Sequence, residues 1–379
     1  MKRVVLTTGG TGGHVFPALA VAEEIRRRFP EAEFLFIGGQ YGPERQMVEK
    51  AGIPFVALPV RGVLGRGVKA IGAFVGLGIS ALKSMRIIRK FNPDVVIGFG
   101  GYAAVAGCVG GKLCGVPVAI HEQNSVPGLT NRLLSKVAKR IFISLPDEQE
   151  FFEPDYTVLT GNPVRAAIAD IRSASKTLDA AAPSVFVCGG SLGAKAVNSA
   201  VVDMLPTLKK LGCTVHHQTG KTDFERIQAA YAEARMDQYI VEPFVDDMAA
   251  AYTAADLVIC RAGATTIAEL TVAGKPALYI PYPHATHNHQ VHNARYLETK
   301  GAAVVVEERE LDQKDMNSIV TELLTSDEKL QSMSVAAKKL GRPEAAASVV
   351  SCILDLLPKS SLESLVHPYN EPEKNESTD

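Results

Sequence analysis

The 379-residue sequence lacks features that define several classes of protein. Its six cysteines form no CxxC pair, so they are typical of small core residues in a reducing compartment rather than of zinc ligands or disulfides. It has no excess of one charge, because 40 Lys and Arg face 41 Asp and Glu, and we expect no nucleic-acid partner. The first apolar run is too short for a signal-peptide core, which predicts a cytoplasmic chain.

The sequence also contains no complete nucleotide-binding or metal-binding signature. A dinucleotide fingerprint needs a third glycine where the first glycine-rich segment has Val15, and a Walker motif needs a glycine at Val215. The segment His284–His292 lacks HExxH spacing, so a polar loop that contacts hydroxyl groups through Asn288 and Gln290 is favoured over zinc. No DxD triplet occurs. We therefore expect no metal and no cofactor, with helix dipoles and arginine neutralising any bound diphosphate.

Short apolar runs alternate with segments of helical length. Successive apolar residues are typical of strands buried on both faces, and their alternation with helices predicts parallel sheets. Two of these runs lead into a glycine-rich turn and a helix start, which predicts an α/β protein of two Rossmann-like domains. The expected strands are Val4–Leu6, Phe34–Ile37, Val95–Ile97, Val118–Ile120, Ile141–Ile143, Val185–Val187, Leu257–Ile259 and Leu278–Ile280.

The two glycine-rich turns are candidate phosphate sites. Glycine lets the backbone approach a phosphate, and a helix N-terminus supplies free amides, although a tight turn alone would also explain them. His14 follows the first turn and is a candidate general base; the alternative is a helix-start residue that bonds the backbone. Glu269 lies on a helix that follows Arg261, where a carboxylate could accept from both hydroxyls of a ribose. The alternative there is a capped helix with a solvated carboxylate.

The segment Val63–Leu82 is apolar, glycine-rich and flanked by basic residues. A membrane-spanning helix needs ~20 continuous apolar residues, and only Ala70–Leu82 is free of charge, so we do not expect it to span a membrane. It could be a core helix or an apolar patch that lies on an anionic bilayer.

Eight short motifs occur in order over nearly the whole chain and together resemble the MurG family of peptidoglycan glycosyltransferases. The sequence departs from the family at two places. Leu192 lies in the middle of a loop that varies within the family. The alignment register of the histidine-rich segment is open, and His289 could occupy a position at which relatives have glutamine. The motifs are GGTGGH (Gly9–His14), GFGGY (Gly98–Tyr102), HEQN (His121–Asn124), GNPVR (Gly161–Arg165), GGSLGA (Gly189–Ala194), FVDDM (Phe244–Met248), CRAGATTIAE (Cys260–Glu269) and the His289-Gln290 pair before Asn293-Ala294.

The resemblance implies a GT-B fold, with two Rossmann-like domains whose parallel sheets face each other across a cleft. It implies an acceptor and membrane-facing domain at 1–163, a UDP-GlcNAc-binding domain at 164–340 and a helix at 341–358 that returns to the first domain. The polar residues 359–379 are expected to be a disordered tail. The implied reaction is inverting transfer of GlcNAc from UDP-GlcNAc to the muramic acid 4-hydroxyl of an undecaprenyl-pyrophosphoryl acceptor, lipid I. It would occur on the cytoplasmic face of the plasma membrane, with anionic lipids contacted by Val63–Leu82, Lys136, Lys139 and Arg140.

The resemblance and the residues together assign a role to each candidate. His14 is the expected base. The acceptor would contact Gly100, Gly101, Tyr102 and Glu122. The donor would contact Thr11, Gly12, Gly13, Asn124, Arg165, Ser191, Val245, Arg261, Ala264, Thr265, Thr266, Ile267, Ala268, Glu269 and Gln290.

Three other functions remain open from the sequence. A related GT-B enzyme could use another lipid acceptor such as diacylglycerol. A nicotinamide oxidoreductase is disfavoured by the broken fingerprint. A sugar-nucleotide binding module without activity is the third alternative.

Overall fold

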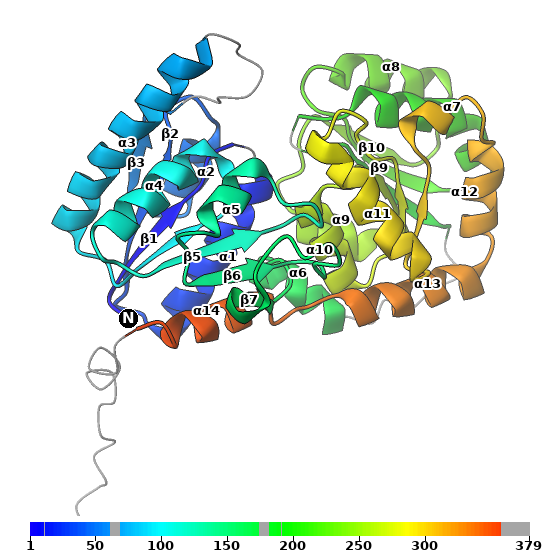
Figure 1. Ribbon diagram of the computed structural model, residues 1–379. Coiled ribbons are helices and arrows are strands. Elements are labelled where there is room, and N and C mark those ends of the chain that lie inside the picture. The colour runs from blue at the N-terminus through cyan, green and yellow to red at the C-terminus, as the bar shows by residue number, and fades with distance from the viewer. Residues whose placement is uncertain (11, 61–68, 174–181, 191, 358–379) are drawn as a thin grey trace, which may run out of the picture.

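The computed structural model describes residues 1–10, 12–60, 69–173, 182–190 and 192–357. Two lobes lie side by side, and each is a parallel sheet covered by helices on both faces (Figure 1). Some of the predictions made from the sequence concern residues outside the described ones. These are Thr11, Ser191, part of Val63–Leu82 and the tail 359–379.

The first lobe contains a seven-stranded sheet in the order β3-β2-β1-β4-β5-β6-β7. Its strands are β1 (Arg3–Thr7), β2 (Glu33–Gly39), β3 (Phe55–Leu58), β4 (Val95–Gly98), β5 (Val118–Glu122), β6 (Arg140–Ile143) and β7 (Thr157–Leu159). Its helices are α1 (Gly12–Arg28), α2 (Glu44–Lys50), α3 (Lys69–Phe91), α4 (Gly101–Leu113) and α5 (Leu129–Leu134), with a 3₁₀ turn η1 (Pro154–Tyr156).

The second lobe contains a six-stranded sheet in the order β10-β9-β8-β11-β12-β13. Its strands are β8 (Ser184–Cys188), β9 (Thr214–Gln218), β10 (Tyr239–Glu242), β11 (Leu257–Cys260), β12 (Ala277–Tyr279) and β13 (Ala303–Val305). The helices after the first sheet are α6 (Ala166–Asp170), α7 (Lys195–Lys210), α8 (Phe224–Glu233), α9 (Met248–Ala254), α10 (Ala264–Ala273), α11 (His289–Thr299), α12 (Met316–Leu324), α13 (Asp327–Leu340) and α14 (Ala345–Leu354), with 3₁₀ turns η2 (Ile171–Ser173), η3 (Thr286–Asn288) and η4 (Glu308–Glu310).

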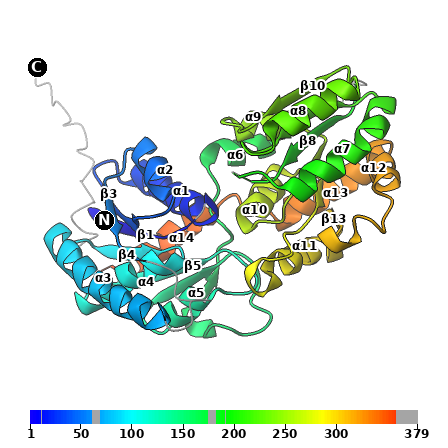
Figure 2. The same ribbon diagram turned by 90° about the horizontal axis from the view of Figure 1, so that it is seen from above.

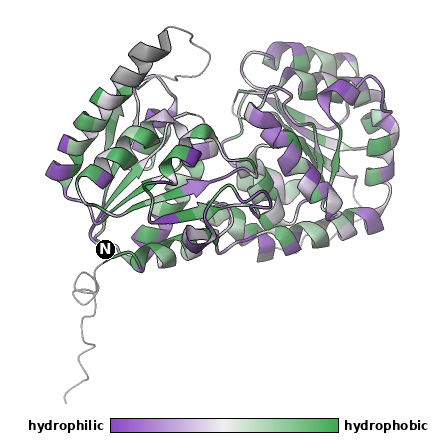
Figure 3. Cartoon of the chain, viewed as in Figure 1, coloured by the Kyte–Doolittle hydropathy of each residue, from purple (hydrophilic) through white to green (hydrophobic). Residues whose placement is uncertain are grey.

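Both sheets follow the Rossmann strand order, and in each the first strand of the lobe lies at the centre. On β1, Val4 and Leu6 pack into the core beneath α1, whereas Val5 packs with Ala103 of α4 on the opposite face. This burial on both faces explains the continuous apolar runs, and Figure 3 shows both sheets mostly in the hydrophobic colour. The predicted α/β architecture with two parallel sheets is confirmed.

The C-terminal helix α14 packs against α1, and Figure 1 shows it below the first lobe, whereas α13 lies below the second. Val349, Val350 and Ile353 enter the first lobe's core, and Arg28 Nη2 donates to the Ala347 carbonyl at 3.1 Å. The chain therefore connects the two lobes a second time. The domain limits drawn from the sequence stay a prediction.

Candidate active site

Three motifs of the first lobe follow neighbouring strands, β1, β4 and β5, whose carboxyl ends share one edge of the sheet. The backbone amide of Gly9 donates to the Gly100 carbonyl at 3.2 Å, and Thr8 Oγ1 donates to the same oxygen at 2.9 Å. The first glycine-rich loop and the loop after β4 therefore form one surface. Ligands of open α/β sheets bind at this edge.

Glycine is required at both residues of the loop after β4. Gly100 and Gly101 have φ of 97° and 77°, which other residues rarely adopt. A Cβ on Gly101 would collide with the Gly9 carbonyl, and one on Gly100 would lie 3.1 Å from Cε1 of His14. The loop can therefore approach both the first glycine-rich loop and the imidazole. Tyr102 is the next residue and is partly exposed.

His14 lies in the first turn of α1 and is partly exposed. Its Nδ1 lies 2.8 Å from Oε1 of Gln123, a residue of the loop after β5. Gln123 was not among the candidates from the sequence. Its place in the HEQN motif, between Glu122 and Asn124, was the signal that could have found it.

Glu122 organises the loop after β5. Its Oε1 accepts from the Asn124 amide at 2.9 Å, and its Oε2 accepts from Asn131 Nδ2 at 2.9 Å and from the Gly128 amide at 3.2 Å. Both carboxylate oxygens are therefore engaged within one loop, and the residue is only 2% exposed.

Asn124 lies at a contact between the lobes. Its Oδ1 accepts from Nδ2 of Asn293 at 3.3 Å, and Oδ1 of Asn293 accepts from the Ser125 amide at 3.0 Å. Asn293 is on α11 of the second lobe and was named only as part of a motif. Contacts between residues so far apart in the chain leave no local signal in a sequence.

The N-termini of α1 and α10 face each other across the two lobes. Thr265 Oγ1 donates to the Gly13 carbonyl at 2.9 Å, and Figure 2 shows the two helices on adjoining sides of their lobes. Neither helix has an acidic residue in its first turn, and Gly263 at the N-cap of α10 has no side chain to cap it. Each N-terminus carries roughly half a positive charge, so together they favour an anion between them.

Glu269 is buried on α10 and holds Arg165. Its Oε1 accepts from Arg165 Nη2 at 3.1 Å, and its Oε2 accepts from the Tyr252 hydroxyl at 3.0 Å. Burial raises the pKa of Glu269, and the Arg165 charge opposes this rise. The Arg165 guanidinium also lies 4.8 Å from the ring centroid of Phe16 on α1, so it spans both lobes.

Arg261 is engaged by the chain itself. Its Nη1 donates to the carbonyls of Ile280 and Pro281 at 3.1 and 3.0 Å, and its Nη2 forms an ion pair with Glu308 at 2.7 Å. The guanidinium therefore fixes the start of the loop after β12. The amide of Tyr282 in that loop donates to Oε1 of Gln290, at the start of α11, at 2.9 Å.

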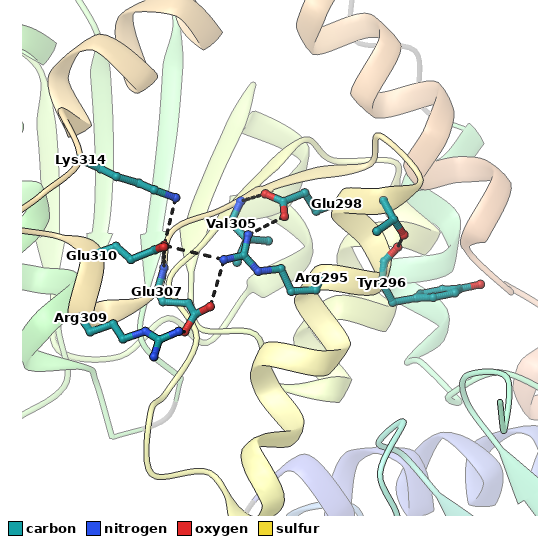
Figure 4. A network of polar contacts seen from close by, with 9 residues as sticks. Arg295, Tyr296, Glu298, Val305, Glu307, Arg309, Glu310 and Lys314 are labelled. Carbon is teal, nitrogen blue, oxygen red and sulfur yellow. Dashed lines mark hydrogen bonds and ion pairs between the residues drawn. The ribbon is translucent and has the colours of Figure 1, made fainter. Parts of the chain in front are cut away.

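A charged network holds η4, the turn that carries Glu308. Figure 4 shows Arg295 of α11 directed at the carboxylates of Glu298 and Glu307, with Nη1 and Nη2 at 2.6 and 3.0 Å. Glu310 connects this cluster to Lys314 at 3.0 Å. The network thus ties α11, which begins with His289 and Gln290, to the turn that pairs with Arg261.

The histidine-rich segment forms η3 and the start of α11. His287 and Asn288 have φ of 51° and 55°. His289 Nδ1 donates to the Thr286 carbonyl at 2.8 Å, and burial lowers the pKa of His289, with a smaller contribution from His14. Among the described residues, no group of three His, Cys, Asp or Glu could hold a metal ion.

The remaining candidates lie at the second sheet's carboxyl edge. Gly193 and Ala194 follow β8, and Val245 follows β10 and is 4% exposed. Ala264, Thr266, Ile267 and Ala268 form the first turns of α10 with Thr265. The structure therefore brings the donor candidates of the described residues to two facing edges.

A cavity of about 110 Å³ also lies between the lobes, behind these edges. Gln123 and Asn162 line it from the first lobe, and Ile267 and Thr271 of α10 line it from the second. Together with the paired helix N-termini, it makes the interlobe region the candidate site.

Comparison with known proteins identifies the class. The model of the glycosyltransferase family 28 N-terminal domain matches residues 4–143, and that of the family 28 C-terminal domain matches residues 184–349. A crystal structure of Acinetobacter baumannii MurG is 34% identical, has a TM-score of 0.74 and covers 94% of this chain and 100% of its own. A UDP-GlcNAc 2-epimerase from Neisseria meningitidis, 14% identical with a TM-score of 0.65, shares the fold alone. The chain is therefore a glycosyltransferase of the GT-B fold.

Two relatives define the family more closely. Each is named UDP-N-acetylglucosamine–N-acetylmuramyl-(pentapeptide) pyrophosphoryl-undecaprenol N-acetylglucosamine transferase. The one from Nitratidesulfovibrio vulgaris Hildenborough is 55% identical over 360 residues, 94% of this chain and 98% of its own length. The one from Listeria welshimeri is 41% identical over 364 residues, 94% of this chain and 99% of its own. The chain belongs to the MurG family.

Proposed function

We propose that this chain transfers GlcNAc from UDP-GlcNAc to N-acetylmuramyl-(pentapeptide) pyrophosphoryl-undecaprenol, which converts lipid I to lipid II in peptidoglycan synthesis. The names of relatives up to 55% identical support this reaction. The observation that carries the site is the pair of facing helix N-termini, joined by Thr265 and Gly13. A diphosphate between them would be stabilised by both helices as negative charge develops on the UDP leaving group.

The donor is proposed to bind mainly to the second lobe, at 164–340. The amides of Ala264–Ala268 contact its diphosphate, Val245 contacts the uracil through its backbone, and Gln290 contacts the sugar hydroxyls. Arg165 and Tyr252 each occupy one carboxylate oxygen of Glu269, and the second lone pair of each oxygen would accept from a ribose hydroxyl. Arg261 acts on the loop after β12, which its three contacts support.

The acceptor is proposed to bind to the first lobe, at 1–163. Gly100, Gly101 and Tyr102 contact its diphosphate. His14 removes the proton of the muramic acid 4-hydroxyl as that oxygen attacks the anomeric carbon of GlcNAc and the bond to UDP breaks, which inverts the anomeric configuration. Its position beside the loop after β4 supports this role.

The first lobe is also proposed to contact an anionic membrane surface. On α3, the serines Ser80 and Ser84 are buried against α4, whereas Ile79 and Leu82 are 49% and 55% exposed. Leu113 of α4 and Leu129 and Leu133 of α5 are also exposed. Nearby basic side chains would meet lipid phosphates. They are Lys83, Arg86, Lys112, Lys136, Lys139 and Arg140. No described helix combines the length and apolarity needed to cross a membrane.

A radiolabel assay tests the function directly. The full chain is incubated with labelled UDP-GlcNAc and either a lipid I analogue or diacylglycerol. We expect label transfer and UDP release only with the lipid I analogue. Transfer to diacylglycerol would support the related enzyme with another acceptor, and no transfer to either would support a binding module. NAD(P)H fluorescence enhancement would favour the oxidoreductase.

The base is tested by His14→Ala in the same assay. We expect kcat to fall roughly 100-fold or more, because a positioned general base contributes about 10²–10⁴ in rate, while the donor KM changes little. His284→Ala is the matched control, since it removes an exposed histidine of the second lobe. Near-normal turnover of His14→Ala would contradict the assignment.

A further inference from the structure

The side chain of Gln123 has only one orientation that satisfies its neighbours. Its amide nitrogen Nε2 lies 3.2 Å from the carbonyl oxygens of both Phe99 and His121. Carbonyl oxygens only accept hydrogen bonds, so the atom that faces them must be the NH₂ group. The amide oxygen Oε1 therefore faces the ring of His14.

His121 agrees with this orientation. Its Nε2 lies 3.0 Å from the Gly161 carbonyl, so Nε2 carries the proton, and burial lowers the pKa of His121 to about 4. The neutral ring then presents an unprotonated Nδ1, which accepts from Nε2 of Gln123 at 3.1 Å. The two N–H groups of Gln123 are thus shared among three acceptors, all of which require the NH₂ group on this side of the amide.

The amide oxygen of Gln123 in turn fixes the proton on His14. Nδ1 of His14 lies 2.8 Å from this oxygen, which can only accept. A lone pair on Nδ1 would face the oxygen's lone pairs, so Nδ1 must carry the proton. The neutral ring then has its lone pair on Nε2, the form that a general base requires.

We propose that Gln123 is a positioning residue that holds His14 in the Nδ1–H tautomer and so keeps Nε2 free to accept a proton. The proposal rests on the role of His14 given above, but the tautomer itself does not. Gln123 is 1% exposed and reaches the reaction only through His14. Its backbone contacts with Phe99 and His121 anchor it to the ends of β4 and β5, which keeps the amide from rotating.

The test combines nitrogen NMR with kinetics on the full chain. The ¹⁵N shifts of His14, assigned by comparison with His14→Gln, report which ring nitrogen carries the proton at a pH where the ring is neutral. We expect Nδ1–H in the wild type and a shift toward Nε2–H in Gln123→Met, with kcat reduced about 10-fold or more and donor KM little changed. Gln123→Glu can accept from Nδ1–H and, when its carboxyl is protonated, donate to the Phe99 or His121 carbonyl, so it should keep the Nδ1–H tautomer and more of kcat than Gln123→Met.

Ser144→Ala is the matched control, because the Ser144 hydroxyl donates to the carbonyl of Glu122, the residue before Gln123, at 3.1 Å. It should leave the tautomer of His14 unchanged. An Nε2–H tautomer in the wild type, or an unchanged tautomer in Gln123→Met, would overturn the proposal. A shifted tautomer with normal kcat would support the control of the tautomer by Gln123 and would instead overturn His14 as the base. If Gln123→Met does not fold, the wild-type spectrum and Gln123→Glu still decide.

Discussion

The charged residues of the site are of two kinds. Some hold a loop of their own lobe in place, and others connect the two lobes. Glu122 and Arg261 direct their charged atoms at their own lobes, the first at the loop after β5 and the second at the loop after β12. Arg165 and Glu269 form a pair whose arginine reaches Phe16 of the other lobe. We expect a substitution of Glu122 or Arg261 to disturb a loop. We expect a substitution of Arg165 or Glu269 to disturb donor binding.

At Glu269 we expect a defect in donor binding. Glu269→Ala leaves the Arg165 charge and the Tyr252 hydroxyl without their partner and removes the proposed ribose contact. A buried hydrogen bond to a charged group is worth about 1.5–3 kcal/mol, so the donor KM should rise roughly 10- to 100-fold. Glu322→Ala, which breaks an exposed ion pair with Lys329, is the control. An unchanged donor KM in Glu269→Ala would contradict the role.

Two buried histidines should make stability depend on pH. Burial lowers the pKa of His121 to about 4 and that of His217 to about 3. In the unfolded chain both titrate near ~6.5. The unfolded state therefore binds more protons below that pH, and stability falls as the pH drops from ~6.5 toward 4.

Each buried histidine contributes roughly 1.4 kcal/mol per pH unit in this window. His217→Asn should reduce the pH slope of the unfolding free energy by about that amount, as measured by urea unfolding at several pH values. An identical slope in wild type and variant would show that His217 is not held neutral by the fold.

At the scale of elements, α3 has an unusual distribution of side chains for a surface helix. Small serines face α4, and a Cβ on Gly110 would lie 2.8 Å from that of Ser84, so the two helices pack closely. Ile79 and Leu82 of α3 are left exposed, whereas Ile88 near its end packs into the core. The sequence alone left a core helix and a membrane patch open; this distribution supports the membrane patch.

Leu82→Asp should weaken binding to a bilayer. The change replaces an exposed apolar side chain with a negative charge that anionic lipids repel. We expect cosedimentation with vesicles that contain phosphatidylglycerol to fall several-fold, with turnover of a water-soluble acceptor analogue unchanged. Val335→Asp, at an exposed apolar position of α13 in the second lobe, is the control. Equal losses in both variants would argue against a specific surface on α3.

The strands that the sequence predicted are apolar in succession, but β3 and β13 have the same pattern and were missed. The eight expected strands are present, although β12 begins and ends one residue earlier. β9 was missed because His216 and His217 interrupt its apolar pattern, and β10 because Tyr239 and Ile240 lie exposed at the edge of the sheet. β3, β7 and β13 are only three or four residues long.

The site was predictable as far as its residues lie in motifs. His14, Glu269 and the start of α10 follow strands at places where any parallel sheet would put a ligand. The contacts of Gln123 with His14 and of Asn293 with Ser125 join segments far apart in the chain. Such contacts depend on how loops and lobes meet, which no local pattern records.

For the whole molecule, side-chain contacts around the site join the two lobes. Thr265 donates to Gly13, Asn293 contacts Ser125 and Arg165 lies against Phe16. The chain also returns to the first lobe through α14, which packs against α1. We propose that a diphosphate held between these lobes is neutralised by two helix N-termini and needs no cation.

The most direct test is steady-state transfer of GlcNAc to a lipid I analogue after dialysis against EDTA. We predict the same kcat in EDTA as in buffer with Mg²⁺ or Mn²⁺. Turnover that collapses in EDTA and returns only when Mg²⁺ or Mn²⁺ is added would contradict it.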